Sequence, residues 1–352
     1  MCLIKIKVLV VDDSALMRKI VSDMINSEED MVVVDVAKNG EEMLEKALKH
    51  NPDIITLDVE MPIMDGISAL REMKRRQINI KAIMLSSVSQ RSTSLTMECL
   101  EAGAFDFIPK PSGAISLDIN KVKDELVLKI RTASEKNPKE FESNEKTNLH
   151  INEKSNHFNK VTHEKIEAVV IGASTGGPKA LYAVVTALPE KIGVPIFIVQ
   201  HMPVGFTKAF ADRLNTNSKI KVVEAEEDTI IEKDIVYVAP GGYHMEVLSD
   251  RRIHLNTEPP IWGVRPAVDK LFSSAAKLYG SHMLSVVLTG MGKDGAQGTV
   301  EIKKNGGVTI SEDKSTCTIY GMPKATFETG MVDLVIPLDE VASQIIRIVN
   351  SR

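Results

Sequence analysis

The chain has 352 residues and a mass of 38.7 kDa, more than twice the roughly 150 residues of a typical single domain, so its length predicts two domains. Apolar residues make up 43% of the chain and charged residues 26%, a composition that excludes disordered, collagen-like and disulfide-scaffold proteins. The 43 basic residues are outnumbered by 48 acidic ones, and the net charge of −5 argues against a nucleic-acid partner.

A signal peptide, a membrane helix and a cysteine pattern together indicate the compartment of a protein. Two lysines interrupt the apolar N-terminal run, which therefore does not resemble a signal peptide, and no stretch reaches the roughly 18 apolar residues of a membrane helix. The 3 cysteines are far apart and form no metal-binding pattern, as is typical of a reducing compartment. We expect a cytoplasmic protein that is not inserted in a membrane.

The N-terminal part alternates β-branched runs with amphipathic helical patterns. The runs lie at 7–13, 31–37, 53–59, 81–87 and 106–111, and the helical patterns at 14–26, 40–50, 66–76 and 92–103. Continuous apolar strands followed by crossover helices are typical of a parallel sheet with both faces covered. We predict a doubly wound α/β domain of five βα units over residues 1–131.

The segment 132–165 has a different character. Of its 34 residues, Glu, Lys and Asn each account for six, only six are apolar, and no periodic apolar stripe is present. Such a segment cannot bury enough surface to offset its ordering entropy. We predict a flexible linker, partly helical at most, in which His150, His157 and His163 are solvated rather than metal ligands.

The α/β pattern returns in residues 166–352. Strands are predicted at 167–174, 195–202, 234–240 and 283–291, helices at 178–189, 208–215, 267–280 and 339–350, and a polar hairpin around 249–255. The fold class is therefore α/β, with a second doubly wound, Rossmann-like domain behind the linker.

Three aspartates follow strands of the N-terminal domain. Asp12 and Asp13 close the first run and Asp58 the third, so they converge at the carboxyl edge of a parallel sheet. Converging carboxylates repel one another unless a cation holds them, and hard oxygen ligands suit Mg²⁺. Ser86 ends the fourth run and Lys110 follows the fifth, which adds a hydroxyl and an ammonium to the same crevice.

The segments VVDDS, TLDVEMPIMDG, MLSS and FIPKP resemble the receiver domain of response regulators over about residues 5–125. The resemblance implies a flavodoxin-like topology and phosphorylation of Asp58 by a histidine kinase. It places Mg²⁺ on Asp13, Asp58 and the backbone carbonyl of Glu60, with Asp12 in support.

The same resemblance assigns the residues around the phosphoryl group. Ser86 and Lys110 would contact the phosphoryl oxygens, and Phe107 stands where receivers carry an aromatic switch residue. A carboxylate in line with a metal-bound phosphoryl donor is a feasible nucleophile, because the metal and the lysine neutralise the developing charge.

A glycine-rich turn, GASTGG at 172–177, follows the first strand of the second domain and leads into a helix begun by Pro178. Two interpretations compete. A GxSxG turn presents Ser174 as a nucleophile near free N–H groups. Alternatively, the turn and the helix N-terminus bind a nucleotide phosphate. The spacing is not GxGxxG, and the next strand ends in Gln200 and His201 without an acidic ribose ligand, which weakens the nucleotide interpretation.

A nucleophilic serine needs a base and an acid that orients this base. His201 follows one predicted strand and Asp294 another, so both lie, like Ser174, at carboxyl ends of strands. The chain order Ser, His, Asp differs from the Ser, Asp, His order of α/β-hydrolases, and GxSxG alone is therefore weak support for that fold.

The segments GASTGGPKAL, VQHMPVGFTKAFADRL, APGGYHM, RPAVDKLF, LTGMGKDGA and YGMPKA occur in this order behind the receiver and the linker. Together they resemble the chemotaxis protein-glutamate methylesterases of the CheB family, and the resemblance covers essentially everything except the linker. It implies Ser174, His201 and Asp294 as a catalytic triad that hydrolyses γ-glutamyl methyl esters on chemoreceptors and releases methanol. Deamidation of receptor glutamines is a further implied activity. The backbone N–H of Met291 is a hypothetical oxyanion donor.

The resemblance also implies partners and cofactors. The partners are methylated chemoreceptors as substrate and a chemotaxis histidine kinase as phosphodonor. Mg²⁺ is expected in the receiver and no cofactor in the esterase. The alternative function is a non-enzymatic response regulator whose C-terminal domain binds a ligand or a partner. We further expect His244 and His282 to be structural. For Trp262 two interpretations compete, a substrate rim formed with Pro259 and Pro260 or packing in a core against a loop, and we favour core packing.

Overall fold

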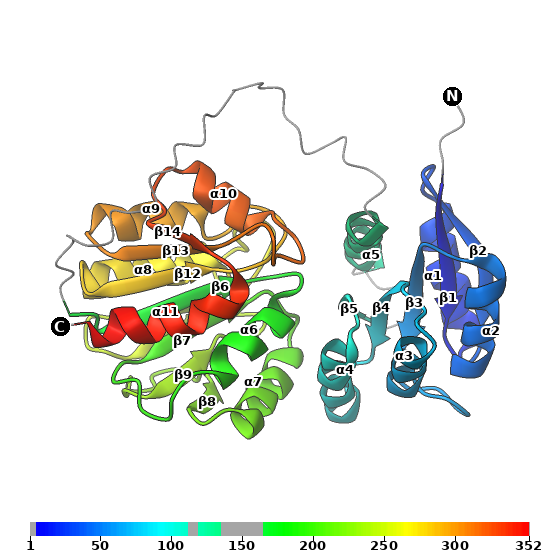
Figure 1. Cartoon of the computed structure of the whole chain (residues 1–352), viewed down its shortest axis with the longest axis horizontal. Helices are drawn as coiled ribbons and strands as arrows, with labels where there is room; N and C mark the ends of the chain where they lie inside the picture. The colour runs from blue at the N-terminus through cyan, green and yellow to red at the C-terminus, as the bar shows by residue number, and fades with distance from the viewer. Residues whose placement is uncertain (1–4, 112–118, 135–164, 352) are drawn as a thin grey trace. The chain divides into compact units, whose positions relative to one another are not determined.

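The computed structural model describes residues 5–111, 119–134 and 165–351. A five-stranded sheet, a seven-stranded sheet and a two-stranded hairpin organise these residues, and Figure 1 labels strands and helices. Among the described helices, none combines the length and the apolar character that crossing a bilayer requires.

The first sheet has five strands in the order β2-β1-β3-β4-β5. The strands are β1 Ile6–Val11, β2 Met31–Ala37, β3 Ile54–Asp58, β4 Lys81–Ser86 and β5 Asp106–Pro109. The pairs β1 with β2, β1 with β3 and β3 with β4 are parallel. This order is the flavodoxin-like one, which confirms the predicted topology.

Helices connect these strands, and four of them begin with a capping side chain. They are α1 Ala15–Asn26, α2 Gly40–His50, α3 Gly66–Arg75, α4 Gln90–Ala102 and α5 Ile119–Ser134. Each cap accepts a hydrogen bond from the backbone N–H three residues on, the caps being Ser14, Asn39, Asp65 and Ser89. The caps explain why each helix starts just beyond the carboxyl edge of the sheet.

The predicted linker falls mostly outside the described residues. The helix α5 runs to Ser134, three residues past the predicted domain end at 131. His150, His157 and His163 lie in the undescribed range 135–164, so the linker and the domain boundaries stay predictions.

The second sheet has seven strands in the order β14-β13-β12-β6-β7-β9-β8, and every neighbouring pair is parallel. The strands are β6 Ala168–Ala173, β7 Ile196–Gln200, β8 Lys221–Glu224, β9 Ile235–Val238, β12 Met283–Val287, β13 Val308–Glu312 and β14 Leu334–Ile336. The sequence patterns missed β8, β13 and β14, which are short and lie toward the two edges of the sheet. The predicted hairpin is present as antiparallel β10 His244–Val247 and β11 Ile253–Asn256.

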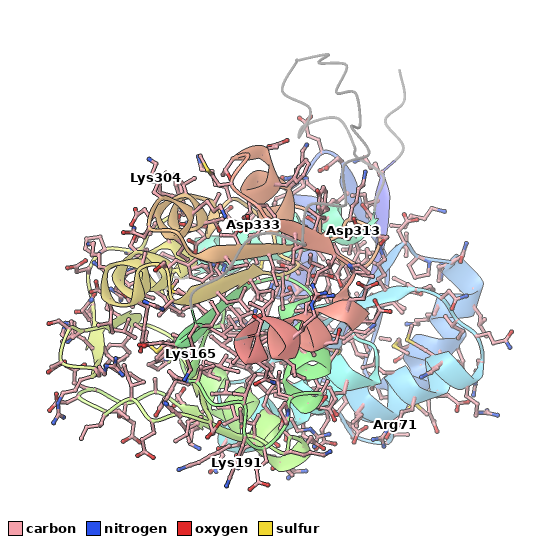
Figure 2. The ribbon with its side chains drawn as sticks, turned by 60° about the vertical axis from the view of Figure 1, so that its left-hand side comes forward. Arg71, Lys165, Lys191, Lys304, Asp313 and Asp333 are labelled. Carbon is pink, nitrogen blue, oxygen red and sulfur yellow. The ribbon has the colours of Figure 1, made fainter. Side chains whose placement is uncertain are left out.

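Two groups of helices accompany this sheet. In one, α6 Gly177–Thr186 contacts both α7 Phe206–Asn217 and α11 Leu338–Asn350. In the other, α9 Ala296–Lys304 contacts both α8 Val268–Tyr279 and α10 Met322–Glu328. The fold class, two doubly wound parallel-sheet parts, is confirmed. Charged side chains such as Arg71, Lys191 and Lys304 project from the outer surface (Figure 2).

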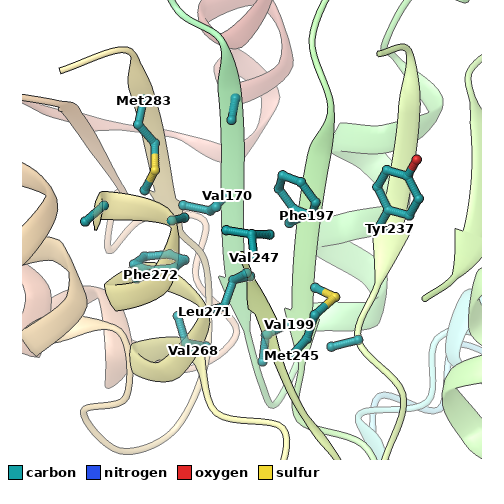
Figure 3. Close-up of a cluster of buried hydrophobic side chains, with 14 of the residues drawn as sticks. Val170, Phe197, Val199, Tyr237, Met245, Val247, Val268, Leu271, Phe272 and Met283 are labelled. Carbon is teal, nitrogen blue, oxygen red and sulfur yellow. The ribbon is translucent and has the colours of Figure 1, made fainter. Parts of the chain in front are cut away.

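The core of the second part lies where α8 and the hairpin cover the sheet. Figure 3 shows Phe197 and Tyr237 side by side on neighbouring strands, with Val170 and Val247 between Phe197 and the α8 residues Leu271 and Phe272. The rings of Phe197 and Tyr237 stack with their centroids 5.6 Å apart. A Cβ on Gly298 would lie 2.4 Å from the Cβ of Phe272, so only glycine lets α9 approach α8 this closely. This packing brings the N-termini of α8 and α9 together at the carboxyl edge of the sheet.

Candidate functional site

The predicted carboxylates converge at the carboxyl edge of the first sheet. Asp12 and Asp13 follow β1, Asp58 ends β3, and one oxygen of each lies within 4.8 Å of the others. Asp12 and Asp58 are buried, whereas Asp13 is exposed. Oxygen donors with one side open to solvent match the preference of Mg²⁺, which keeps several waters.

Lys110 joins this cluster. Its Nζ lies 2.8 Å from Asp12 Oδ2 and 2.7 Å from Asp58 Oδ2. Burial, followed by the negative charge of Asp12, raises the pKa of Asp58 to about 6, although Lys110 acts in the opposite direction. Three ionised carboxylates and one ammonium leave two negative charges, which a divalent cation would balance.

The other predicted receiver residues are Glu60, Phe107 and Ser86. The backbone N–H of Glu60 donates to Asp58 Oδ1 at 3.3 Å. Phe107 is buried. The hydroxyl of Ser86 is fully buried and accepts a hydrogen bond from Thr96 Oγ1 of α4 at 2.6 Å. Phosphoryl contact by Ser86 stays a prediction.

The nucleophile turn lies at the centre of the second sheet. Ser174 follows β6, whose neighbours β7 and β12 lie on opposite sides, and such a switch point is where open α/β sheets bind ligands. The register pairs Ala173 with Gln200, and the N–H of His201 donates to the carbonyl of Ala173 at 3.1 Å. Ser174 and His201 are therefore adjacent at the ends of neighbouring strands. Gly176 allows the tight turn with a φ of 77°.

His201 and Asp294 form the predicted pair. His201 Nε2 lies 2.8 Å from Asp294 Oδ2, with the histidine side chain 11% and the aspartate 2% exposed. An ionised carboxylate can only accept, so Nε2 carries the proton and Nδ1 is the ring nitrogen left to act as a base toward Ser174. In the serine-protease template the two nitrogens have the opposite roles. Among the described residues, no hydrogen bond joins Ser174 Oγ to His201, and such catalytic bonds often tighten only in a substrate complex.

Asp294 is held by the N-terminus of α8. Its Oδ2 also accepts the N–H of Val268 at 2.6 Å, and its Oδ1 accepts the N–H of Asp269 at 2.8 Å. Burial alone would raise the pKa of Asp294, but the hydrogen bond and charge of His201, together with these N–H groups, lower it below its usual value. The carboxylate is therefore ionised at neutral pH and can accept a hydrogen bond from the imidazole.

Gln200 is a site residue that the sequence patterns did not indicate. Its side chain is 2% exposed, and Nε2 donates to the carbonyls of Ser174 at 2.9 Å and of His201 at 3.1 Å. One buried amide thus joins the nucleophile turn to the base. Its position directly before His201, at the end of a predicted strand, is the sequence feature that could have indicated Gln200 as a site residue.

The TGMG turn packs against the nucleophile. The N–H of Ser174 donates to the carbonyl of Thr289 at 3.0 Å, and a Cβ on Gly290 would lie 2.8 Å from the Cβ of Ser174. Met291 therefore follows a residue in contact with Ser174. The role of its N–H as an oxyanion donor stays a prediction.

The remaining predictions for this part had mixed outcomes. His244 is buried, with Nδ1 accepting the N–H of Ala267 and Nε2 donating to the carbonyl of Pro259, which fits a structural role. The prediction for Trp262 was wrong, because its side chain is 55% exposed. A left-handed φ of 53° in the turn between Ile261 and Val264 accompanies this outward position.

Comparison with known proteins finds matches to both parts. The family model described as CheB methylesterase matches residues 169–345, and the one described as response regulator receiver domain matches residues 8–119. A Clostridium acetobutylicum protein named protein-glutamate methylesterase/protein-glutamine glutaminase is 57% identical over 350 residues, covering 98% of each chain. A Pyrococcus horikoshii protein of the same name is 47% identical, covering 98% of this chain and 94% of its own. The crystal structure of the Thermotoga maritima CheB methylesterase catalytic domain is 42% identical with a TM-score of 0.51, covering 52% of this chain and 99% of that one.

Proposed function

This chain belongs to the CheB methylesterase family, and from that premise we propose that it is a phosphorylation-regulated protein-glutamate methylesterase and protein-glutamine glutaminase. It hydrolyses γ-glutamyl methyl esters of methylated chemoreceptors to release methanol, and it deamidates receptor glutamines. The observation that carries the proposal is the pair of His201 and Asp294, 2.8 Å apart, beside Ser174 at the switch point of the sheet.

The first half of the reaction is acyl transfer to the enzyme. Ser174 Oγ attacks the carbonyl carbon of the γ-ester while His201 Nδ1 takes the hydroxyl proton. Asp294 holds the imidazole through Nε2 and stabilises the imidazolium that forms. The oxyanion of the tetrahedral intermediate lies at the N–H of Met291, the proposed donor. The imidazolium then protonates the departing methoxide, methanol leaves, and an acyl-enzyme stays on Ser174.

The second half releases the receptor carboxylate. A water molecule gives a proton to His201 and attacks the acyl-enzyme, and the imidazolium returns this proton to Ser174. A glutamine side chain follows the same steps with ammonia as leaving group, so one site serves both activities.

We propose Asp58 as the phosphoacceptor that regulates this reaction. Asp13, Asp58 and the carbonyl of Glu60 would hold Mg²⁺ with support from Asp12, and the bound ion would neutralise charge on the transferring phosphoryl group. Lys110, which already contacts two of the carboxylates, would bind a phosphoryl oxygen.

The remaining regulatory assignments concern Ser86, Phe107 and the phosphodonor. Ser86 would supply a second phosphoryl contact, and Phe107 would act as the switch residue. The donor would be a chemotaxis histidine kinase. A cytoplasmic location stays a prediction.

Methanol release from methylated receptor membranes tests the function. We expect the full chain to release methanol and a small phosphodonor such as acetyl phosphate to increase the rate. A fluorophosphonate probe separates the alternative, a non-enzymatic regulator, because only an activated serine is labelled. Absence of both methanol release and Ser174 labelling would favour the non-enzymatic regulator.

Replacement of the phosphoacceptor gives a further prediction. We expect Asp58→Asn to reduce the ratio of the rates with and without acetyl phosphate to about 1, because an amide cannot form an acyl phosphate. Asp23→Asn removes an exposed carboxylate that pairs with Lys19 in α1, and this control should keep the wild-type ratio. Mass spectrometry of the intact protein should show phosphorylation of the control but not of Asp58→Asn. Continued stimulation of Asp58→Asn would assign the phosphoacceptor elsewhere.

A further inference from the structure

A second buried carboxylate lies directly behind the proposed triad. Asp269, the second residue of α8, is 7% exposed and accepts three hydrogen bonds. Its Oδ1 accepts the N–H groups of Gly295 at 2.9 Å and Gly298 at 2.7 Å, at the start of α9. Its Oδ2 accepts the indole N–H of Trp262 at 3.0 Å. Oδ1 therefore caps the N-terminus of α9, whereas Oδ2 binds the indole of Trp262.

Asp269 and Asp294 cap each other's helices. Asp294 lies in the turn before α9 and accepts the first N–H groups of α8, while Asp269 lies in α8 and accepts the first N–H groups of α9. The N–H of Gly295 is shared, at 3.0 Å from Asp294 Oδ1 and 2.9 Å from Asp269 Oδ1. Neither carboxylate can move without releasing a helix N-terminus, where negative charge is favoured. The position of Asp294 thus depends on Asp269.

An exposed aromatic residue completes the arrangement. Trp262 is the single tryptophan of the chain, and its indole N–H points to Asp269 while the ring is largely open to solvent. The ammonium of Lys293, next to Asp294, lies 4.0 Å from the ring centroid. The side chain of Trp262 therefore contacts Lys293, the residue before Asp294. It also donates a hydrogen bond to Asp269, which caps the same helix as the turn of Asp294.

We propose that Asp269 is a positioning residue of the esterase: it fixes the turn that presents Asp294 to His201, and its charge helps to stabilise the imidazolium. This inference rests on the proposed triad. Its consequence is that the acid limb of the activity profile, where His201 must lose its proton to act as a base, depends on the charge of Asp269.

Few charged groups other than Asp269 lie close enough to influence the acid limb of the pH profile. Asp294 and Lys293 face it from the turn before α9, and His201 lies beyond Asp294. Most other titratable groups on α8, α9 and β10 have their own partners: Lys270 with Glu258 and Glu246, Glu301 with Ser273, Lys303 with Asp333, and His244 with Ala267 and Pro259. Lys277 and Lys304 are exposed and lie toward the C-terminal ends of α8 and α9, away from Asp269. Burial and the charge of Asp294 raise the pKa of Asp269, while the indole and glycine N–H groups oppose this.

The test removes the charge of Asp269 and keeps the helix cap. In Asp269→Asn, Oδ1 still accepts the two glycine N–H groups, but the new amide N–H groups oppose the indole N–H of Trp262. Trp262→Phe removes that conflict. The comparison is therefore between Trp262→Phe alone and Trp262→Phe with Asp269→Asn, which differ in the charge of residue 269 and in the replacement of Oδ2 by an amide nitrogen that no longer faces an indole. Asp250→Asn in the Trp262→Phe background is the matched control, because Asp250 is an exposed carboxylate of the hairpin turn.

We expect the double variant to move the acid limb of kcat/KM for methanol release to lower pH by about 0.5 to 1 unit relative to Trp262→Phe. Its kcat should fall about 3- to 10-fold with little change in KM, since the lost interaction acts on the imidazolium and not on substrate binding. The control should match Trp262→Phe. A folded double variant with the pH profile and kcat of Trp262→Phe would overturn the inference.

A second measurement needs no change at Asp269. Because Trp262 is the single tryptophan, its fluorescence reports on the Asp269 contact in the full-length protein. We expect Asp294→Asn to shift the emission of Trp262, because it disturbs the shared N–H groups, and Asp250→Asn to leave it unchanged. An unchanged emission in folded Asp294→Asn would contradict the coupling. Failure of the proposed triad is recognised separately: wild-type protein would then not be labelled at Ser174 by the fluorophosphonate.

Discussion

We expect Ser174→Ala to lower kcat for methanol release by about 10⁴- to 10⁶-fold, because the acyl-enzyme route disappears with the hydroxyl. His201→Ala should cost a similar factor, since without Nδ1 no base takes the serine proton. The double variant should be little worse than either single one, because the residues act as a unit. Initial rates on methylated receptor membranes, with circular dichroism to verify folding, measure these losses.

A matched serine supplies the control for this experiment. Ser343→Ala removes an exposed hydroxyl from α11, and we expect wild-type rates. Near-normal methanol release by folded Ser174→Ala would rule out the serine mechanism. Additive losses in the double variant would mean that Ser174 and His201 serve different steps.

Asp294→Asn should lower kcat by about 10⁴-fold, the loss known for the corresponding role in the serine-protease template. The physical reason is specific to the ring orientation found in this chain. An amide N–H facing Nε2 favours the tautomer with its proton on Nδ1, and that tautomer cannot accept the proton of Ser174. Single-turnover labelling of Ser174 by the fluorophosphonate measures the loss without a receptor. An unaltered rate in folded Asp294→Asn would remove this residue from the triad.

The same variant has a pH-dependent effect on stability. The pKa of Asp294 is lowered in the folded state, so its contribution to stability is fully present above the unfolded pKa of about 3.9 and is lost as the pH falls through the folded value. The difference in unfolding free energy between wild type and Asp294→Asn should therefore be constant near neutral pH and shrink in acid below about pH 4. Urea denaturation at several pH values measures it. A difference that persists undiminished in acid would contradict an ionised Asp294.

Much of the fold was predictable because its signals are local. Continuous β-branched runs such as those that became β1 and β6 favour buried strands whatever their partners are. The strands β8, β13 and β14, with four, five and three residues, were missed, because strands toward the edges of a sheet form only when a neighbouring strand supplies hydrogen bonds.

Part of the candidate site was also predictable. In a parallel sheet, residues that follow strands meet at the carboxyl edge, so the approach of His201 to Asp294 followed from their places in the chain. The same rule brought Asp12, Asp13 and Asp58 together. No comparable rule indicates which partner a buried hydroxyl binds, and Ser86 accepts the hydrogen bond of Thr96 for reasons that only packing supplies.

The sequence by itself determined the two parallel sheets, the chain order of their central strands and the residue types at the carboxyl edges, because these follow from the period of apolar residues and from the geometry of crossover connections. Only the tertiary structure decided which nitrogen of His201 meets Asp294, that Asp294 caps α8, and that Asp269 and an exposed Trp262 lie behind it. These contacts join residues distant in the chain, and their geometry depends on how two helices pack rather than on any local pattern.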